Sequence, residues 1–282
     1  MSNENTTIHN NELFANLVGA AQFAAYENSI ARQIVTVFDM PQNAGKVVQV
    51  PIWAAVSATN ISDESEATFA NTATSSASIT LSEHVVAHRV TDMLRDSSYS
   101  DVMASLGDQS GRAIAESMDK QVFSLFTSFT EGGPGANTAV TTSHIMKAAA
   151  TLRTAKLTGP FVAVLHPKQA YALKRELALN GGSNIPSLSA VGEGVLMDGY
   201  IGTVSGVSVY ESGLITVDGS GDAVGAVFAP AAIGHSMRGS ITMEAQRQAA
   251  ARATDIVLTA VAGASILNTA YGVKITSDAT FV

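Results

Sequence analysis

The sequence predicts an α+β protein in which one long amphipathic helix lies against extended strands. Two observations carry this prediction. Apolar residues recur with three- and four-residue spacing from Ser98 to Phe129, the longest periodic segment of the 282-residue chain. Segments with two-residue alternation precede and follow it. A long helix with one apolar face needs a thin layer to pack against, and the flanking strands can supply that layer.

Composition and charge narrow the classes of function. Only 14% of the residues are charged, whereas about 25% is typical, so much of the surface must be neutral. Neutral surface is what a self-associating protein buries against copies of itself. A net charge of −8 without any cluster of Lys and Arg argues against a reader of nucleic-acid sequence. The chain has no cysteine, which excludes disulfides and thiolate chemistry.

The sequence shows no targeting or membrane segment. Residues 1–5 have neither the basic region nor the apolar core of a signal peptide. The most apolar runs, 223–234 and 256–267, are shorter than the roughly 20 residues that a bilayer-spanning helix requires. We therefore expect a soluble protein that is made in a cytoplasm and has no membrane partner.

The N-terminal part begins with a polar, Asn-rich stretch. Residues 1–11 predict an arm without its own core. Helical spacing from Glu12 to Arg32 predicts a helix, and Ile34 to Phe38 then becomes extended.

A long hairpin is predicted next. Two-residue alternation begins at Gly45, and Pro51 confines that strand to the edge of a sheet. Residues 57–78 are mostly Ser, Thr, Ala and Asn, and alternation returns at 79–85. Such a hairpin cannot bury a core of its own and must lie on something else. Its polar part carries the acids Asp63, Glu64 and Glu66.

The long helix follows the hairpin and ends at the Gly-rich stretch 130–135. Gly107 and Gly111 each cost about 1 kcal/mol in a helix interior, so we predict a bend or a close backbone contact there. The pattern assigns these residues to the polar face: Asp101, Ser105, Asp108, Arg112, Glu116, Asp119 and Lys120.

A compact region follows. Ser143 is the predicted N-cap of a helix that ends near Leu157. Phe161 to Leu165 predicts a buried strand, and Pro167 opens a helix that runs to Asn180. The remaining predicted extended segments are 200–204, 207–210, 223–228, 240–246 and, with glycine breaks, 255–282.

Four segments and the order of the elements resemble a known family. The segments are Gly159–Pro167, Gly202–Ser212, Ala226–Ile233 and Tyr271–Val273. Together with the hairpin and the long helix, they make the chain similar to the major capsid proteins of tailed bacteriophages, which have the Hong Kong-97 capsid fold. The likeness covers nearly the whole chain in order.

The resemblance implies a domain plan and a function. The plan is an N-terminal arm at 1–44, an extended E-loop hairpin at 45–88, a P-domain with the long spine helix at 89–140, an A-domain at 141–237 and P-domain return strands at 238–282. The function implied is a shell of hexamers and pentamers, an icosahedral phage head that encloses double-stranded DNA without sequence-specific contact. The implied partners are portal and scaffolding proteins, with room for a cement protein. The implied location is the virion capsid, which is assembled in the host bacterial cytoplasm. Because the chain begins at Met1 and leads directly into the arm, we expect the scaffold to be a separate protein.

The resemblance also places the E-loop over the spine of an adjacent subunit, where the hairpin acids need cations. We expect Asp63, Glu64 and Glu66 to meet Arg112 and Lys120 of the neighbour, with Arg95 as a reserve. Simple solvation of the three acids remains the alternative, because exposed ion pairs contribute only about 0–1 kcal/mol each. Residues 47–88 contain neither Lys nor Arg, so we expect no covalent cross-link from a lysine of the hairpin.

Motifs for catalysis or metal binding are weak, and we predict a protein that is not an enzyme and has no catalytic, cofactor-binding or metal-binding residue. His84 and His88 have the spacing of a zinc helix, but they lack the Glu base, and in a strand they would lie about 13 Å apart. The stretches 192–194 and 219–221 lack the ending of a phosphate-binding loop. His166 before Pro167 is expected to be a helix-entry residue.

Two alternative functions remain from the sequence. The first is an encapsulin-like compartment that encloses an enzyme. The second, more distant, is an α+β hydrolase built from scattered Ser, His and Asp residues. The run 246–253, with Arg247 and Arg252, fits a packed or intersubunit segment better than a nucleic-acid contact, because two arginines supply little electrostatic affinity.

Overall fold

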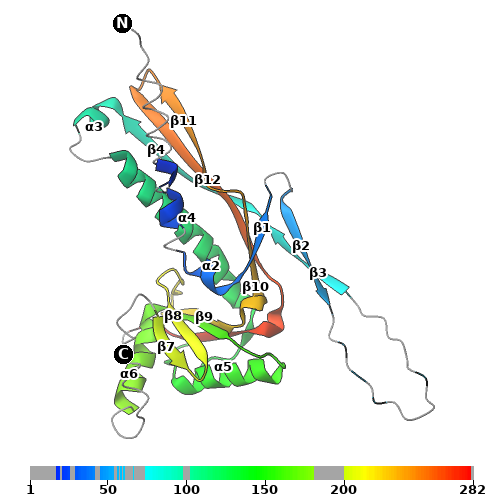
Figure 1. Ribbon diagram of the computed structural model, residues 1–282. Helices are drawn as coiled ribbons and strands as arrows, with labels where there is room; N and C mark the ends of the chain where they lie inside the picture. Colours follow the sequence, from blue (N-terminus) through cyan, green and yellow to red (C-terminus); the bar gives the residue numbers. More distant parts are fainter. Residues whose placement is uncertain are drawn as a thin grey trace.

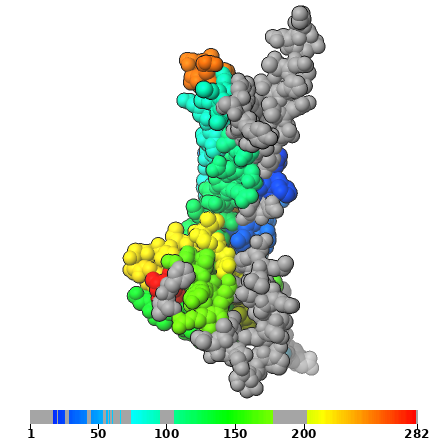
Figure 2. All heavy atoms as spheres, turned by 90° about the vertical axis from the view of Figure 1, so that its left-hand side faces the viewer, coloured from blue at the N-terminus to red at the C-terminus, as the bar shows by residue number. Residues whose placement is uncertain are grey.

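The computed structural model describes residues 17–19, 21–25, 29–41, 45–53, 74–97, 102–180 and 200–280, together with positions 56, 58, 60 and 66. The described part of the chain is elongated (Figures 1 and 2). A long blade of strands and one helix forms one end, a second sheet with its helices forms the other, and a two-stranded hairpin projects from the side (Figure 1).

The blade is built on β12 (Ala253–Ile266), a 14-residue strand. Along its first half β12 pairs antiparallel with β4 (Ser82–Thr91) on one edge and with β11 (Thr242–Gln248) on the other. Its second half pairs with β10 (Ile233–Arg238), and β1 (Thr36–Met40) adds to β10 in parallel. We call these five strands the spine sheet.

One face of the spine sheet is covered by α4 (Val102–Ser124), which continues as the 3-10 helix η1 (Leu125–Ser128). This confirms the long helix, although positions 98–101 of the predicted range lie outside the described residues. The sequence did not predict the preceding short helix α3 (Asp92–Ser97). Ile114, Met118 and Val122 of α4 are buried against the strands and the N-terminal segment.

The N-terminal segment lies along α4. Residues 17–19 and 21–25 are helical, and α2 (Ala31–Ile34) follows. The prediction of one helix through Arg32 was wrong, because Ser29 and Ile30 are not helical. The predicted close contact is confirmed: a Cβ on Gly107 would lie 2.8 Å from the carbonyl oxygen of Leu17, and one on Gly111 would overlap the carbonyl of Ala21.

The second sheet has the order β5-β13-β9-β6-β8-β7. Its central strand β6 (Phe161–Leu165) is buried at every position, as predicted. The helices α5 (Thr142–Thr154) and α6 (Pro167–Asn180) pack against it. The other strands are β5 (Thr130–Glu131), β7 (Tyr200–Val204), β8 (Val207–Glu211), β9 (Asp222–Phe228) and β13 (Gly272–Asp278).

Details of this region differ from the prediction. Thr141, not Ser143, is the N-cap of α5, because Thr141 and His144 form a reciprocal capping box.

Two 3-10 turns, η2 (Pro230–Ala232) and η3 (Thr269–Tyr271), link the two sheets. β10 lies in the spine sheet and β13 in the second sheet, so sheet membership does not follow the predicted boundary after residue 237. The domain boundaries stay predictions.

The hairpin consists of β2 (Val47–Trp53) and β3 (Thr74–Thr80), which pair in antiparallel register. This confirms two edge strands around the polar stretch. The predicted return strand is divided at Leu81, however, because the chain beyond it leaves the hairpin and pairs with β12 as β4. The nearly buried Leu81 donates its amide to the carbonyl of Lys46 (2.9 Å), which fixes the base of the hairpin.

Candidate assembly surface

The hairpin has no core of its own. β2 and β3 form a separate two-stranded sheet, and exposed and half-buried positions alternate along β2. Trp53 at the outer end of β2 is 68% exposed and Val47 at its base is 45% exposed. The hairpin leaves the body of the molecule at an angle (Figure 1). A two-stranded ribbon is marginally stable alone, so this one needs a surface outside its own chain.

The hairpin is nevertheless anchored firmly at its base. Ile79 is fully buried, and its Cδ1 would lie only 2.9 Å from a Cβ added to Gly234 of β10. The Arg238 guanidinium donates a hydrogen bond to the Gly45 carbonyl (3.1 Å). The direction of the hairpin is therefore set by the spine sheet.

Within the described part of the chain, the face of the spine sheet opposite α4 is left exposed along β4. Along β4, positions 83, 85, 87 and 89 are exposed, and the alternate side chains point toward α4. Val85 is 54% exposed and pairs with Thr259 of β12. The facing residues of β12 are half-buried and mostly neutral. We call this the outer face and define it by Val85, Ala87, Val257, Thr259 and Val261.

Two bidentate ion pairs hold the far end of the blade together. Arg89 of β4 binds both carboxylate oxygens of Asp255 on β12, and Arg247 of β11 binds those of Asp92 on α3 at 2.7 Å each. The run 246–253 forms the end of β11 and the exposed turn into β12. Arg247 is thus engaged within the subunit.

The predicted contact residues are only partly described. Glu66 is exposed, whereas Asp63 and Glu64 lie outside the described residues. Arg112 and Lys120 are both exposed on α4, and Arg112 pairs with Asp108 one turn before it (3.1 Å). The backbone of Arg95 belongs to α3, but its side chain lies outside the described part. The pairing of these groups between subunits stays a prediction.

Asp119 was assigned to the polar face of the helix, and that assignment was wrong. Its side chain is 1% exposed and accepts hydrogen bonds from the Ser29 hydroxyl (2.7 Å) and from the amides of Ile30 (2.9 Å) and Ala31 (3.4 Å). It therefore holds the start of α2 on α4, in the manner of a helix cap supplied by another element. Burial raises the pKa of Asp119, and these hydrogen bonds oppose that shift.

The histidines that suggested other chemistry have structural contacts. His84 Nδ1 lies 2.7 Å from the Ser117 hydroxyl, and His88 Nε2 lies 2.9 Å from the Ser110 hydroxyl, so the two imidazoles meet different turns of α4. Ser110 in turn donates to the Leu106 carbonyl. His166 Nδ1 accepts the Lys168 amide (3.2 Å), which confirms it as a helix-entry residue.

Of the two glycine pairs, 192–194 lies outside the described residues. The pair at 219–221 belongs to a turn in which the Asp218 carboxylate accepts the amides of Ser220 and Asp222, so the acid occupies the place a phosphate would need. None of the helices in the described part of the chain combines the length and apolar character that a bilayer crossing requires.

Sequence reasoning missed the buried polar residues of β10. His235 is 3% exposed and Ser236 is fully buried, between β1 and β12. The segment mixes Gly, His, Ser and Arg, so neither its alternation nor its apolar content signals a strand. The flanking apolar residues Ile233 and Met237 were the only available sign.

Known proteins resemble this chain in both sequence and fold. The family of phage capsid proteins matches residues 75–275. No curated protein matches the sequence. Among solved structures, the head of Helicobacter pylori bacteriophage KHP40 is 13% identical with a TM-score of 0.68, over 90% of this chain and 91% of that one. The capsid of cyanophage P-SCSP1u is 16% identical with a TM-score of 0.65, over 86% of both chains. A virus-like particle from Pyrococcus furiosus is 14% identical with a TM-score of 0.59, over 92% and 97%.

Proposed function

The chain belongs to the phage capsid protein family, and we propose that its copies assemble through the hairpin and the spine sheet into the shell of a phage head. The fold is Hong Kong-97-like, as the sequence predicted. The observation that carries the proposal is the family match, which runs from β3 into β13 and so includes the long helix, the strands of the second sheet and all the strands of the spine sheet except β1. The role is structural: the protein acts by binding itself, not by catalysis.

The physical reason for assembly is the unfinished surface of the single subunit. The hairpin cannot stabilise itself, and the outer face of the spine sheet leaves Val85 and its neutral neighbours in water. When one such surface covers the other, apolar area is removed from water. Each Å² of this area stabilises the contact by about 25 cal/mol. Because the hairpin projects beyond its own spine, the covering surface belongs to another copy (Figure 1).

Charge can add a separate contact on the α4 side of the neighbour's spine, the side away from the outer face. The exposed Glu66, with Asp63 and Glu64, meets a positive surface on the neighbour in our proposal, formed by Arg112 and Lys120 with Arg95 as a reserve. The contribution of each pair is about 0–1 kcal/mol, so charge sets direction and salt dependence more than total affinity.

The finer assembly follows from the family. We infer hexamers and pentamers in an icosahedral shell that encloses double-stranded DNA, assembled in the bacterial cytoplasm with portal and scaffolding proteins and with room for a cement protein. The net charge of −8 agrees with packaging without sequence-specific contact. The domain plan of arm, E-loop, P-domain and A-domain is carried over with these roles.

The second candidate is an encapsulin-like compartment. The likeness to the Pyrococcus furiosus particle supports it, at a lower TM-score than the phage heads. The two candidates differ in cargo: a phage shell contains DNA and a compartment contains protein. A hydrolase has no support from the family or from the histidine contacts described above.

The proposal is tested by purifying the full chain with and without the hairpin strands. Size-exclusion chromatography and electron microscopy should show megadalton particles or capsomers for the full chain, and only small species when residues 47–80 are replaced by a short Gly-Ser linker. Exchange of Lys147 for Gln, an exposed change on α5, is the control and should assemble normally. A full chain that remains monomeric at high concentration, with the expected scaffold present, would contradict the proposal.

The shell should also lack covalent links through the hairpin. Residues 47–88 contain no Lys, and Lys46, just before them, lies at the anchored base of the hairpin, where its carbonyl binds Leu81. Boiled particles should therefore run as single chains on a denaturing gel. A ladder of multimers would overturn this expectation.

A further inference from the structure

Buried polar atoms without partners gather where the N-terminal segment joins the spine sheet. Among the described residues, His235 Nδ1 and Ser236 Oγ are buried side-chain atoms that lack a hydrogen bond. His84 Nε2 and Gln121 Oε1 are also buried without one by strict geometry, although the Gln121 side chain acts on His84 as a hydrogen-bond partner. They come from β4, α4 and β10, which pack together. A buried polar atom without a partner has lost its hydrogen bonds to water and destabilises the closed joint relative to an opened one.

His235 is the most deeply buried ionisable group of this set. Burial, followed by the positive charge of Arg32 and the nearness of His84, lowers the pKa of His235 from 6.5 to about 4. Burial also lowers the pKa of His84, although the Gln121 side chain opposes that shift. Both imidazoles are therefore neutral at pH 7. If either one binds a proton, its positive charge is repelled by Arg32 and by the other imidazole when that is charged.

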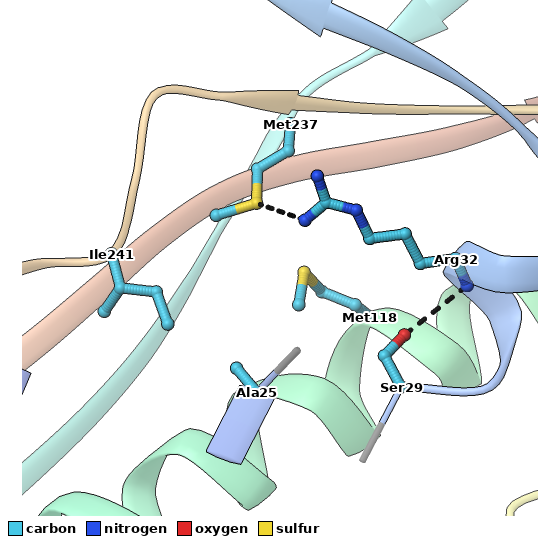
Figure 3. Close-up of a pocket in the computed structure, with 6 residues that line it drawn as sticks. All are labelled: Ala25, Ser29, Arg32, Met118, Met237 and Ile241. Carbon is cyan, nitrogen blue, oxygen red and sulfur yellow. Dashed lines mark hydrogen bonds between the residues drawn. The ribbon is translucent and has the colours of Figure 1, made fainter. Parts of the chain in front are cut away.

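Arg32 acts on His235 through its positive charge. Arg32 extends from α2 along the pocket formed with Ala25, Met118 and Ile241, and it reaches the Met237 sulfur at 3.8 Å (Figure 3). The carboxylate of Asp119 on α4 is occupied by Ser29 and the first amides of α2. Asp39 of β1 is exposed. His235 itself lies in register with Val37 of β1 and Ala264 of β12, which carry no charge.

We infer that this joint is an acid-sensitive catch, in which protonation of His84 and His235 beside Arg32 releases residues 29–40 from the spine sheet. At neutral pH β1 stays paired with β10, and α2 stays capped by Asp119. In mild acid, the opened joint binds protons that the closed joint excludes, so opening becomes more favourable.

Release of residues 29–40 should also affect the hairpin, because a short segment joins them to its base. β1 ends at Met40, and β2 begins at Val47, so only six residues separate the catch from the hairpin base. Arg238, at the end of β10, holds that base through Gly45. The effect on assembly rests on the proposed function, but the catch lies within one subunit and can be tested whether or not the chain assembles.

Hydrogen exchange of the full chain at pH 7.5 and pH 5.0, corrected for the intrinsic exchange rate, tests the catch. If opening exposes His235, a change in its pKa from about 4 to 6.5 should raise the opening equilibrium of β1 about 30-fold between these pH values. Strand β6 of the second sheet is the internal reference and should change little. The exchange rate of β1 should recover on return to pH 7.5.

The variant His84→Gln/His235→Gln should remove most of this acid response. His88→Gln is the matched control, because His88 lies on the same strand and also contacts a serine of α4, and it should respond like the unmodified chain. If the double variant does not fold, His235→Gln alone is used, and it should reduce the acid response of β1 relative to that of β6. Equal acceleration of β1 and β6, or a response that persists without both histidines, would overturn the inference.

Discussion

The two sheets of the subunit are completed in different ways. In the second sheet, β6 is buried at every position, with α5 and α6 on one side and the rings of Phe126, Phe129 and Phe228 on the other. The spine sheet has α4 on one face only, and Val85 on its outer face is 54% exposed. The hairpin β2-β3 forms a separate two-stranded sheet, and positions along both of its strands are exposed. The second sheet is covered within its own chain, whereas the spine sheet and the hairpin keep surfaces that a neighbouring copy can cover.

This difference separates the stability of the subunit from the stability of the shell. Changes in the second sheet should alter unfolding of every subunit to the same extent, assembled or not. Changes on the hairpin and the outer face should alter assembly with little effect on the isolated subunit, because exposed side chains usually change stability by less than about 0.5 kcal/mol. Variants in the second sheet and variants on the hairpin should therefore differ in their effects on unfolding and on assembly.

The largest effect is expected from Phe228→Ala. Phe228 is fully buried, with its ring 5.5 Å from that of Phe126 and 6.4 Å from that of Phe129. Its removal should lower the free energy of unfolding by about 3–5 kcal/mol, measured by denaturant titration of isolated subunits. Trp53→Ala removes a ring that is 68% exposed; it should leave this free energy nearly unchanged and weaken assembly. Equal losses in the two variants would remove the distinction between the regions.

Acid should act on the spine region through His235. The group is neutral when folded, with a pKa of about 4, while the unfolded chain binds the proton near 6.5. The stability it contributes is therefore present above pH 6.5 and is lost as the pH falls toward 4, by about 3 kcal/mol in all. His235→Gln should reduce the pH dependence over this range by that amount in parallel denaturant titrations. An identical pH profile in the variant would contradict the burial of a neutral histidine.

Asp119→Ala should cost about 2 kcal/mol, because it leaves Ser29 and the first amides of α2 without their acceptor. Glu116→Ala, at an exposed position of the same helix, is the control and should change stability little. Thermal unfolding of both variants at pH 7 provides the measurement. A loss as small as that of the control would mean that the cap does not hold the N-terminal segment.

These residues also show how far the sequence could predict the structure. The buried strand β6, the helix at Pro167 and the close contact at Gly107 follow from apolar runs, proline and glycine, which act locally. Asp119 could not be placed, because its hydrogen-bond partners lie 88 to 90 residues away. β10 was missed for the same kind of reason: its parallel partner β1 lies almost two hundred residues earlier in the chain.

The smallest effect is expected from the hairpin acids. Replacing Asp63, Glu64 and Glu66 by Asn and Gln should weaken assembly by up to about 1 kcal/mol per ion pair and flatten its salt dependence. Lys120→Gln should have a similar effect, whereas Lys147→Gln on α5 should have none. Light scattering across a salt titration gives the comparison. Unchanged assembly in the triple variant would leave the hairpin held by apolar contacts and backbone pairing.

The central claim is that the hairpin and the outer face are completed only by a neighbouring copy. Hydrogen exchange of dissociated subunits and of assembled particles, measured at the same pH, tests it most directly. The account predicts that β2, β3 and the exposed edge of β4 exchange quickly in the subunit and become strongly protected in the particle, while β6 and β9 are protected equally in both. Protection of the hairpin in the isolated subunit to the level of β6, with no gain on assembly, would contradict it.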